Sequence, residues 1–299
     1  MPTKHIPVLL QEILEHTHLA PGMTIFDGTL GGGGYAQAFS HITGEKGMLV
    51  GTDLDPAALK RVSDIEFISQ TNFIHGSYAQ ILDIADDLGV KFDVAVVDLG
   101  LSSDQLDLEK RGFSFKDESQ PLDMRFNSED GETAADILNS WSEENIADVI
   151  FGFGGERYSR GIAKRVVERR LEKKIATVGD LVEIIKSSTP YSYHKRRTHP
   201  ATKTFQALRI VVNTEWKHIQ EFLENAPKAV RPGGYIAIVS FHSGEDKVVK
   251  HTFRDMKEKG IGTIVTKKPI TAGEEELSQN PRSRSALLRI FRVGEHTEK

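Results

Sequence analysis

Three aspartates of this 299-residue chain each close a short apolar segment: Asp27, Asp53 and Asp98. Each segment is rich in Val, Ile, Leu or Phe, and we expect each to form a strand. In a doubly wound sheet the carboxyl ends of neighbouring strands open onto one crevice, so residues far apart in the sequence become neighbours in space. The spacing therefore predicts three carboxylates around a single ligand site.

The turn after Asp27 reads Asp-Gly-Thr-Leu-Gly-Gly-Gly-Gly and ends at Gly34. Glycines permit positive φ and carry no β-carbon, so at Gly31 and Gly33 a ligand can lie against bare peptide. A pyrophosphate beside the Asp27 carboxylate would be repelled, which disfavours a dinucleotide. S-adenosylmethionine, a nucleoside with a sulfonium and an ammonium group, fits better. The alternative is an ordinary flexible turn without a ligand.

Asp53 and Asp98 invite different roles. Asp53 stands where a carboxylate accepts hydrogen bonds from ribose hydroxyls; an aspartate before Pro56 could also cap a helix, but Asp55 alone could do that. Asp98 leads into Leu-Gly-Leu-Ser-Ser, and an acceptor there could hold the hydrogens of an exocyclic amine, turning its lone pair toward a methyl group. The alternative for Asp98 is a cofactor or cap contact without catalytic duty.

Strand and helix patterns alternate over the first hundred residues, which is typical of a parallel sheet with helices on both faces. Polar sequence at 104–140 interrupts this rhythm, and helical patterning follows, with a capping box at Thr177 and Asp180. One long amphipathic helix is expected from Thr204 through Leu223. The expected later strands follow a Pro-Gly-Gly turn and lie at 235–241 and near 261–266 and 286–293. We expect an α/β fold, a doubly wound sheet interrupted by an inserted helical domain.

Charge is distributed unevenly along the chain. Residues 151–203 contain thirteen Lys or Arg and five Asp or Glu, a net +8, within a chain of net charge −5. A basic segment on an acidic body indicates nucleic-acid binding, although solvated helix faces also carry such charge. Aromatic residues beside basic ones at 191–197 suit RNA. For the arginines at 282–292, a solvated end strand is an equally good interpretation.

Composition excludes several classes of protein. There are no cysteines, so disulfides, thiolate metal sites and cysteine nucleophiles are excluded, and no other cluster predicts a metal site. No long apolar run or export signal is evident, so we expect a cytoplasmic protein with no membrane partner. The sequence leaves monomer and homodimer open.

Over nearly its full length the chain resembles the bacterial 16S ribosomal RNA cytosine-N4 methyltransferase family. The matching motifs are His5-Ile-Pro-Val-Leu-Leu10, Asp27-Gly-Thr-Leu-Gly-Gly-Gly-Gly34, Asp98-Leu-Gly-Leu-Ser-Ser103, Arg111-Gly-Phe-Ser-Phe115, Pro121-Leu-Asp-Met-Arg125, His199-Pro-Ala-Thr202, Thr204-Phe-Gln-Ala-Leu-Arg-Ile210, Ser240-Phe-His-Ser243 and Asn280-Pro-Arg-Ser-Arg-Ser285. The resemblance implies a class I methyltransferase (Rossmann-like) sheet at 1–105 and 203–299, and an RNA-recognition domain at 106–202. It also implies methyl transfer from S-adenosyl-L-methionine to a cytosine N4 in the decoding region of 16S rRNA, within the small ribosomal subunit.

By the same resemblance, the cofactor contacts fall on Gly33, Gly34, Tyr35, Asp53, Tyr78, Asp98 and Gln105, with Asp27 and Gly31 in the same turn. Tyr35 stands where the family usually has His, and Tyr78 where it usually has Phe; an aromatic ring can stack in either place. Gly244 stands where the family has Leu, which could loosen the loop that contains His242.

Asp98, Ser102 and His242 are the expected catalytic residues. The amine can lose its proton after methyl transfer, so the chemistry does not need His242 as a base; His242 would position the base or order its loop, or be a buried structural histidine. The competing functions are a methyltransferase acting on another nucleic acid or on protein, and a non-catalytic RNA-binding ribosome factor. Intact aspartates and glycines argue against the latter.

Overall fold

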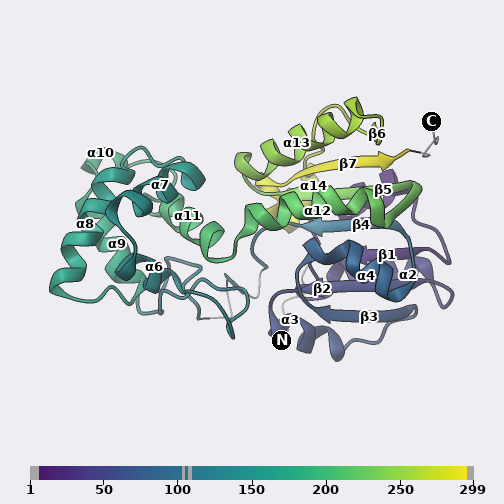
Figure 1. Ribbon diagram of the computed structural model, residues 1–299, viewed down its shortest axis with the longest axis horizontal. Helices are drawn as coiled ribbons and strands as arrows, with labels where there is room; N and C mark the ends of the chain where they lie inside the picture. Colours follow the sequence, from purple (N-terminus) through teal and green to yellow (C-terminus); the bar gives the residue numbers. More distant parts are fainter. Residues whose placement is uncertain (1–6, 103–104, 107–109, 295–299) are drawn as a thin grey trace. The chain divides into compact units, whose positions relative to one another are not determined.

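The computed structural model describes residues 7–102, 105–106 and 110–294. The chain divides into two compact units, Met1–Gly100 with Trp216–Lys299, and Leu101–Glu215 (Figure 1). The division falls at 100 and 215, whereas the sequence suggested 105 and 203. Within the described ranges, every helix is too short or too polar to cross a membrane.

The first unit is built on a seven-stranded sheet with the strand order β3-β2-β1-β4-β5-β7-β6. Strands β1 to β5 pair in parallel, and β7 runs antiparallel to both β5 and β6. The strands are β1 (Thr24–Asp27), β2 (Met48–Asp53), β3 (Gln70–His75), β4 (Phe92–Asp98), β5 (Val230–Ser240), β6 (Gly262–Ile264) and β7 (Leu287–Val293).

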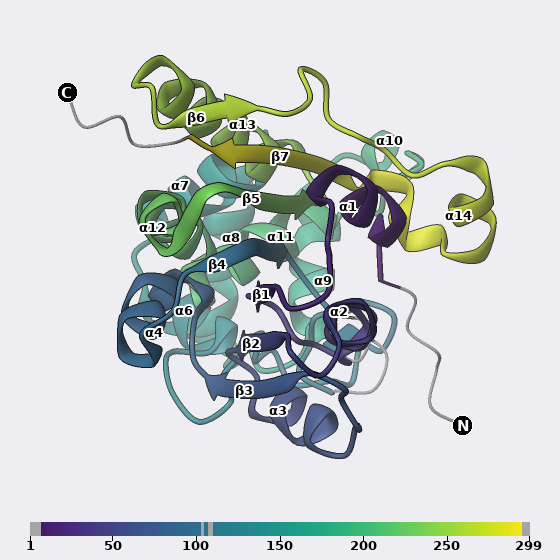
Figure 2. The same cartoon turned by 90° about the vertical axis from the view of Figure 1, so that its right-hand side faces the viewer.

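Helices cover both faces of this sheet. The helices of this unit are α1 (Leu10–Thr17), α2 (Gly34–Thr43), α3 (Pro56–Ser63), η1 (Tyr78–Gln80), α4 (Ile81–Leu88), α12 (Glu215–Ala229), α13 (Ser243–Glu258), α14 (Glu274–Gln279) and η2 (Pro281–Ser285). One buried cluster joins the sheet to α4, α12 and α13, and another joins it to α1, α2 and α3. Figure 2 shows α4 and α12 on one side of the sheet and α1 and α2 on the other. The predicted fold class, a doubly wound sheet with a helical insertion, is confirmed.

The second unit is helical and has its own core. Its helices are α6 (Ala134–Ser140), α7 (Glu143–Gly154), α8 (Ser159–Glu172), α9 (Val178–Ser187), α10 (Tyr191–His194) and α11 (Thr202–Val212). Their apolar faces meet in one cluster that includes Leu138, Ile150, Leu181 and Phe205. The predicted capping box of α9 is confirmed, since Thr177 and Asp180 bond to each other's backbone N–H.

The single long helix expected from Thr204 is wrong, because the chain breaks at Asn213 and Thr214. Thr214 adopts a positive φ of 47°, and α12 starts at the next residue. The Asn213 side chain donates to the Met124 carbonyl at 2.7 Å and accepts from the Phe126 N–H at 2.6 Å. A hydrophobic pattern in phase on both sides of a break resembles one continuous helix, which is why the pattern concealed the division between the two units.

Candidate functional site

The three aspartates lie at the carboxyl ends of three adjacent parallel strands. β1 is flanked by β2 and β4, and Asp27 lies in register with Gly51 on one side and Val96 on the other. Asp53 and Asp98 end the two flanking strands. The sheet thus brings the three predicted carboxylates together. Burial raises the pKa of both Asp98 and Asp27, and a neighbouring charge raises each further, that of Asp27 for Asp98 and that of Asp53 for Asp27.

Asp27 is fully buried. Its Oδ1 accepts a hydrogen bond from the Thr29 N–H at 3.1 Å. Among the described residues, Oδ2 has no hydrogen-bond donor. Burial raises the pKa of Asp27 to about 7, the Thr29 N–H lowers it, and the charge of Asp53 raises it. A buried acceptor without a donor is costly and uncommon in a folded protein, which marks Asp27 as a candidate ligand contact.

Asp98 repeats this arrangement at the end of β4. Its Oδ1 is buried and meets no donor in the part of the chain that the structure describes. Burial raises the pKa of Asp98 well above its ordinary value, and the charges of Asp27, Glu245 and Glu276 raise it further. The site is therefore strongly electronegative, and a cation placed there would relieve the repulsion.

Asp53 is held more firmly. Its Oδ2 accepts from the Gly31 N–H at 2.8 Å and its Oδ1 from the Asp55 N–H at 2.9 Å. Burial raises the pKa of Asp53 to about 6, while these two N–H groups lower it. Asp55 caps α3 with its own carboxylate, accepting from the Ala57 N–H. Capping is thus performed by Asp55, as the sequence suggested, and Asp53 fixes the glycine turn.

The glycine turn places two residues in the left-handed region, Gly31 at φ 49° and Gly33 at φ 78°. A β-carbon on Gly33 would lie 2.8 Å from Ile65 Cδ1, so the missing side chain also lets the turn pack against the segment after α3. Gly33 is the N-cap of α2 and makes no side-chain cap bond. The first N–H groups of a helix lack partners within the helix, so Gly34 and Tyr35 begin a helix end suited to an anion.

The Tyr35 ring is a core element. It is 4% exposed, it stacks on Phe39 with centroids 5.8 Å apart, and its hydroxyl donates to the Val8 carbonyl. Only its backbone N–H remains suited to a ligand. Tyr78, at the start of η1, is half-buried and packs edge-on against Phe222 and His218.

Thr29 links the two open carboxylates, a role that the sequence analysis missed. Its Oγ1 accepts the Asp98 N–H at 2.8 Å, and its own N–H donates to Asp27. One residue thus joins the ends of β1 and β4. A polar side chain two positions after a strand-end aspartate was the available signal. Glu276, which accepts the Leu9 N–H at 2.9 Å, was also missed, and its run of three glutamates gave no signal.

His242 lies beyond β5, the strand that pairs with β4, as predicted. It is the N-cap of α13: Nδ1 accepts from the Gly244 and Glu245 N–H groups at 3.1 and 3.3 Å. Nε2 lies 2.9 Å from Glu245 Oε1. Because Nδ1 accepts hydrogen bonds, a neutral ring is the tautomer with its proton on Nε2, which faces Glu245. His242 therefore orders its loop, and Gly244, whose β-carbon would lie 3.0 Å from Nδ1, leaves room for the ring.

Ser102 and Gln105 belong to the second unit and bind each other. Gln105 Oε1 accepts from the Ser102 N–H at 3.0 Å, and the Gln105 N–H donates to Ser102 Oγ at 3.2 Å. Their expected catalytic and cofactor roles stay predictions. The motif residues His5, Ile6 and Ser103 lie outside the described residues.

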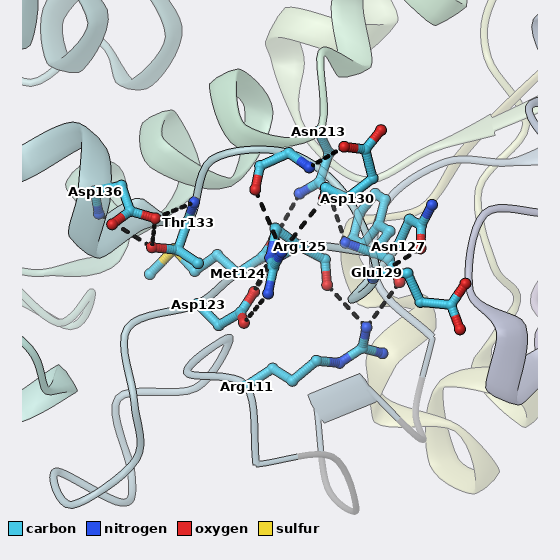
Figure 3. A network of polar contacts seen from close by, with 12 residues as sticks. Arg111, Asp123, Met124, Arg125, Asn127, Glu129, Asp130, Thr133, Asp136 and Asn213 are labelled. Carbon is cyan, nitrogen blue, oxygen red and sulfur yellow. Dashed lines mark hydrogen bonds and ion pairs between the residues drawn. The ribbon is translucent and has the colours of Figure 1, made fainter.

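Two other motifs form a polar network in the second unit, around Met124 at φ 63° (Figure 3). Arg111 Nη1 donates to the carbonyls of Arg125 and Phe126 at 2.8 and 2.7 Å. Arg125 forms a two-pronged pair with Asp123, with both bonds at 2.8 Å. The carbonyl and N–H groups around Met124 are bonded to Asn213 and Arg111. This arrangement holds a strained turn.

The arginines of the C-terminal segment are partly structural. Arg289 is 8% exposed and binds both oxygens of Asp246 at 2.6 and 3.1 Å. Arg292 donates to the Gly233 carbonyl and lies 5.9 Å from the Tyr235 ring. Arg289 is thus neither solvated nor open to RNA, because it pairs with a residue 43 positions away.

Comparison with known proteins adds independent sequence evidence. The model of the MraW methylase family matches residues 2–293. The Ribosomal RNA small subunit methyltransferase H of Heliobacterium mobile is 42% identical, covering 96% of this chain and 97% of that protein. The protein of the same name from Nostoc sp. is 43% identical, covering 96% and 91%. A solved structure of an rRNA methylase from Streptococcus thermophilus covers 99% of both chains with 9% identity and a TM-score of 0.45.

Proposed function

Because the chain belongs to the MraW methylase family, we propose that it transfers a methyl group from S-adenosylmethionine to the N4 amine of a cytosine in 16S rRNA of the small ribosomal subunit. The acceptor would be a base in the decoding region, and the place of action the cytoplasm. Relatives that are named as small-subunit rRNA methyltransferases, and that match this chain over nearly their whole length, support the substrate class.

The residues present fit the cofactor. Asp27 Oδ2 and Asp98 Oδ1 are buried acceptors that lack donors within the described residues, as sites for an ammonium and a sulfonium require. Asp53 is anchored by two N–H groups and would accept the ribose hydroxyls. The start of α2, at Gly34 and Tyr35, would meet the carboxylate of the amino-acid part through backbone N–H groups.

S-adenosylmethionine supplies an electrophilic methyl group, so that a bond to N4 forms as the sulfur–carbon bond breaks. The exocyclic amine is a poor nucleophile because its lone pair is delocalised into the ring. Asp98 would accept an N–H of the amine and turn the lone pair toward the methyl group, contributing orientation and electrostatic stabilisation. As the N–C bond forms the amine becomes acidic, and its proton passes to Asp98 or to water. Thr29 would hold Asp98 in place through the Asp98 N–H.

We do not propose His242 as the base that takes the proton from the N4 amine. Nδ1 accepts two N–H groups of the cap, Nε2 lies 2.9 Å from Glu245 Oε1, and a base that abandons the cap would release the start of α13. A catalytic role of Ser102 and a cofactor contact of Gln105 remain part of the proposal.

One observation carries this proposal: two open carboxylates at adjacent strand ends in a chain that matches a methylase family over residues 2–293. The test is incubation with methyl-labelled S-adenosylmethionine and small subunits that lack the modification, followed by nuclease mapping and identification of the labelled nucleoside. We expect N4-methylcytidine at one position of 16S rRNA. Label on protein, on another base, or on no RNA would overturn the proposal.

A further inference from the structure

The positive charge of the second unit separates into two groups. In one group, basic side chains are already engaged: Arg165 with Glu168, Arg169 with Glu172 and Glu183, Lys173 with Asp180, Lys186 with Glu118, Arg170 with the Leu138 and Trp141 carbonyls, and Lys203 with the Gly155 carbonyl. The net +8 already counts four of these carboxylates, so the contacts show which basic side chains are engaged and do not reduce that charge. The basic segment as a whole is therefore not a uniform RNA surface.

The other group lies over tyrosine rings. The Arg157 guanidinium is 4.7 Å from the Tyr158 ring centroid and 5.7 Å from that of Tyr193. Arg196 lies 4.8 Å from the Tyr193 ring. Within the described ranges, no carboxylate is at ion-pair distance from Arg157 or Arg196. We call Arg157, Tyr158, Tyr193 and Arg196 the arginine–tyrosine ladder.

A buried carboxylate holds the two tyrosines of the ladder in place. Glu156 is fully buried; its Oε2 accepts the Tyr193 hydroxyl at 2.5 Å and its Oε1 the Tyr158 N–H at 2.9 Å. Burial and Glu156 raise the pKa of Tyr193 to about 12, so the hydroxyl stays a donor. Tyr193 packs edge-on against Tyr158 with centroids 5.1 Å apart. The rings are therefore fixed, and each guanidinium rests on a rigid surface while remaining exposed to solvent.

Tyr191 extends the same surface. It is 73% exposed, and Lys195 Nζ lies 4.9 Å from its ring centroid. Exposed aromatic rings beside cations are what unpaired nucleotides bind, because bases stack on the ring and phosphates meet the cations. Duplex RNA offers no free base face, so an exposed ring gains little from it.

We propose that the arginine–tyrosine ladder, together with Tyr191 and Lys195, binds a single-stranded segment of RNA, with one base stacked on Tyr191 and phosphates at Arg157 and Arg196. The guanidinium groups are held in place before RNA arrives, so little side-chain entropy is lost on binding. This inference rests on the proposed function, since it supplies the contact between the enzyme and its RNA.

The test measures fluorescence anisotropy of a labelled, unstructured RNA oligonucleotide with the full chain, across a series of salt concentrations. We expect Tyr191→Ala to raise the dissociation constant for the oligonucleotide about tenfold, because one stacked base is lost. The Tyr191→Phe variant should bind the oligonucleotide as the wild type does. Replacing Arg157 and Arg196 together with Gln should lower the slope of log affinity against log salt by about 1.4, since each single-strand phosphate contact contributes about 0.7. A duplex of the same sequence should respond little to Tyr191→Ala.

Arg165→Gln is the matched control, because it removes one exposed charge of α8 that Glu168 already neutralises. It should leave the slope unchanged, and S-adenosylmethionine affinity should be equal in all variants. Equal losses in Arg165→Gln and the ladder variants, or unchanged binding of Tyr191→Ala, would overturn the ladder. A methylation assay on small subunits distinguishes the ladder proposal from the proposed function. If the wild type is active and Tyr191→Ala leaves its KM unchanged, the ladder alone is rejected. If the wild type is inactive but still binds the oligonucleotide, the proposed function alone is rejected.

Discussion

Two groups of charged motif residues in this chain look alike in sequence and differ in structure. At the ends of β1 and β4, Asp27 and Asp98 each present a buried oxygen without a donor in the described residues. In the second unit, Arg111 and the Asp123–Arg125 pair are bonded to carbonyls and to each other (Figure 3). The first group carries the electrostatic cost of a binding site, whereas the second is only half-buried and finds its partners within the chain.

The comparison shows which polar groups a fold can spare for function. A buried group whose partners all lie in the chain stabilises the chain, and its loss leaves other groups unpaired. A buried carboxylate with a raised pKa and an oxygen that lacks a donor destabilises the free protein. It makes a favourable contact only when a ligand binds. The two groups should therefore respond in opposite ways to substitution.

The largest effect is expected for Asp98→Asn. Turnover should fall at least about a hundredfold, because the amide oxygen is a neutral and weaker acceptor than the carboxylate, and the amide NH2 cannot accept at all. The midpoint of urea unfolding should stay the same or rise, because a buried, repelled carboxylate has been removed. Steady-state methylation and urea titration measure the two quantities.

The matched variant in the second unit is Asp123→Asn, which should lower the unfolding midpoint because it leaves Arg125 without its carboxylate. If Asp98→Asn destabilised the chain and Asp123→Asn did not, the distinction between open and closed groups would fail.

Arg111→Met should lower the free energy of unfolding by about 2–3 kcal/mol. The substitution removes the donor for two carbonyls beside the positive-φ residue Met124. Urea unfolding measures the loss, and calorimetry should show unchanged S-adenosylmethionine affinity at a temperature where the variant is folded. A variant as stable as the wild type, with weakened cofactor binding, would assign Arg111 to the site instead.

Thr29→Val should reduce turnover about tenfold and stability by about 1 kcal/mol, because the Asp98 N–H loses its acceptor. Thr29→Ser keeps the hydroxyl and should restore turnover. The cofactor dissociation constant should change less than turnover does. Failure of Ser to rescue would mean that Thr29 acts through packing of its methyl group.

The smallest effect is expected for His242→Asn, since Asn is also a good N-cap. Stability should fall by less than about 1 kcal/mol, and the pH profile of turnover should keep its shape. An acidic limb that disappears in this variant would make His242 the general base.

The sequence predicted what depends on local pattern. Apolar runs ending in Asp27, Asp53 and Asp98 identified three strands and the residues at their carboxyl ends. This was possible because a strand and its end are encoded within a few residues. Thr177 and Asp180 likewise identified the start of α9.

Contacts between distant residues were not predictable in this way. Arg289 looked like part of a basic tail and pairs with Asp246, and Tyr35 looked like a cofactor platform and is packed on Phe39. The break at Thr214 depends on Asn213 reaching residues more than 80 positions away. Composition and periodicity carry no information about such partners.

The most direct test is calorimetric titration with S-adenosylmethionine at pH 6 in two buffers of different ionisation enthalpy. In the free protein, burial and repulsion hold the pKa of Asp27 near 7 and that of Asp53 near 6, with Asp98 and Tyr35 beside Asp27 and Arg61 facing Asp53. These raised values mean that stability falls as pH rises from about 4 to about 7, since the folded state binds more protons than the unfolded state.

A bound cation lowers the pKa values of Asp27 and Asp53. We therefore predict net proton release at pH 6, tighter binding at pH 8, and a smaller release in Asp27→Asn, with Asp53 and Asp98 supplying the remainder. Binding without proton release, with equal affinity in Asp27→Asn, would contradict a cofactor site at these strand ends.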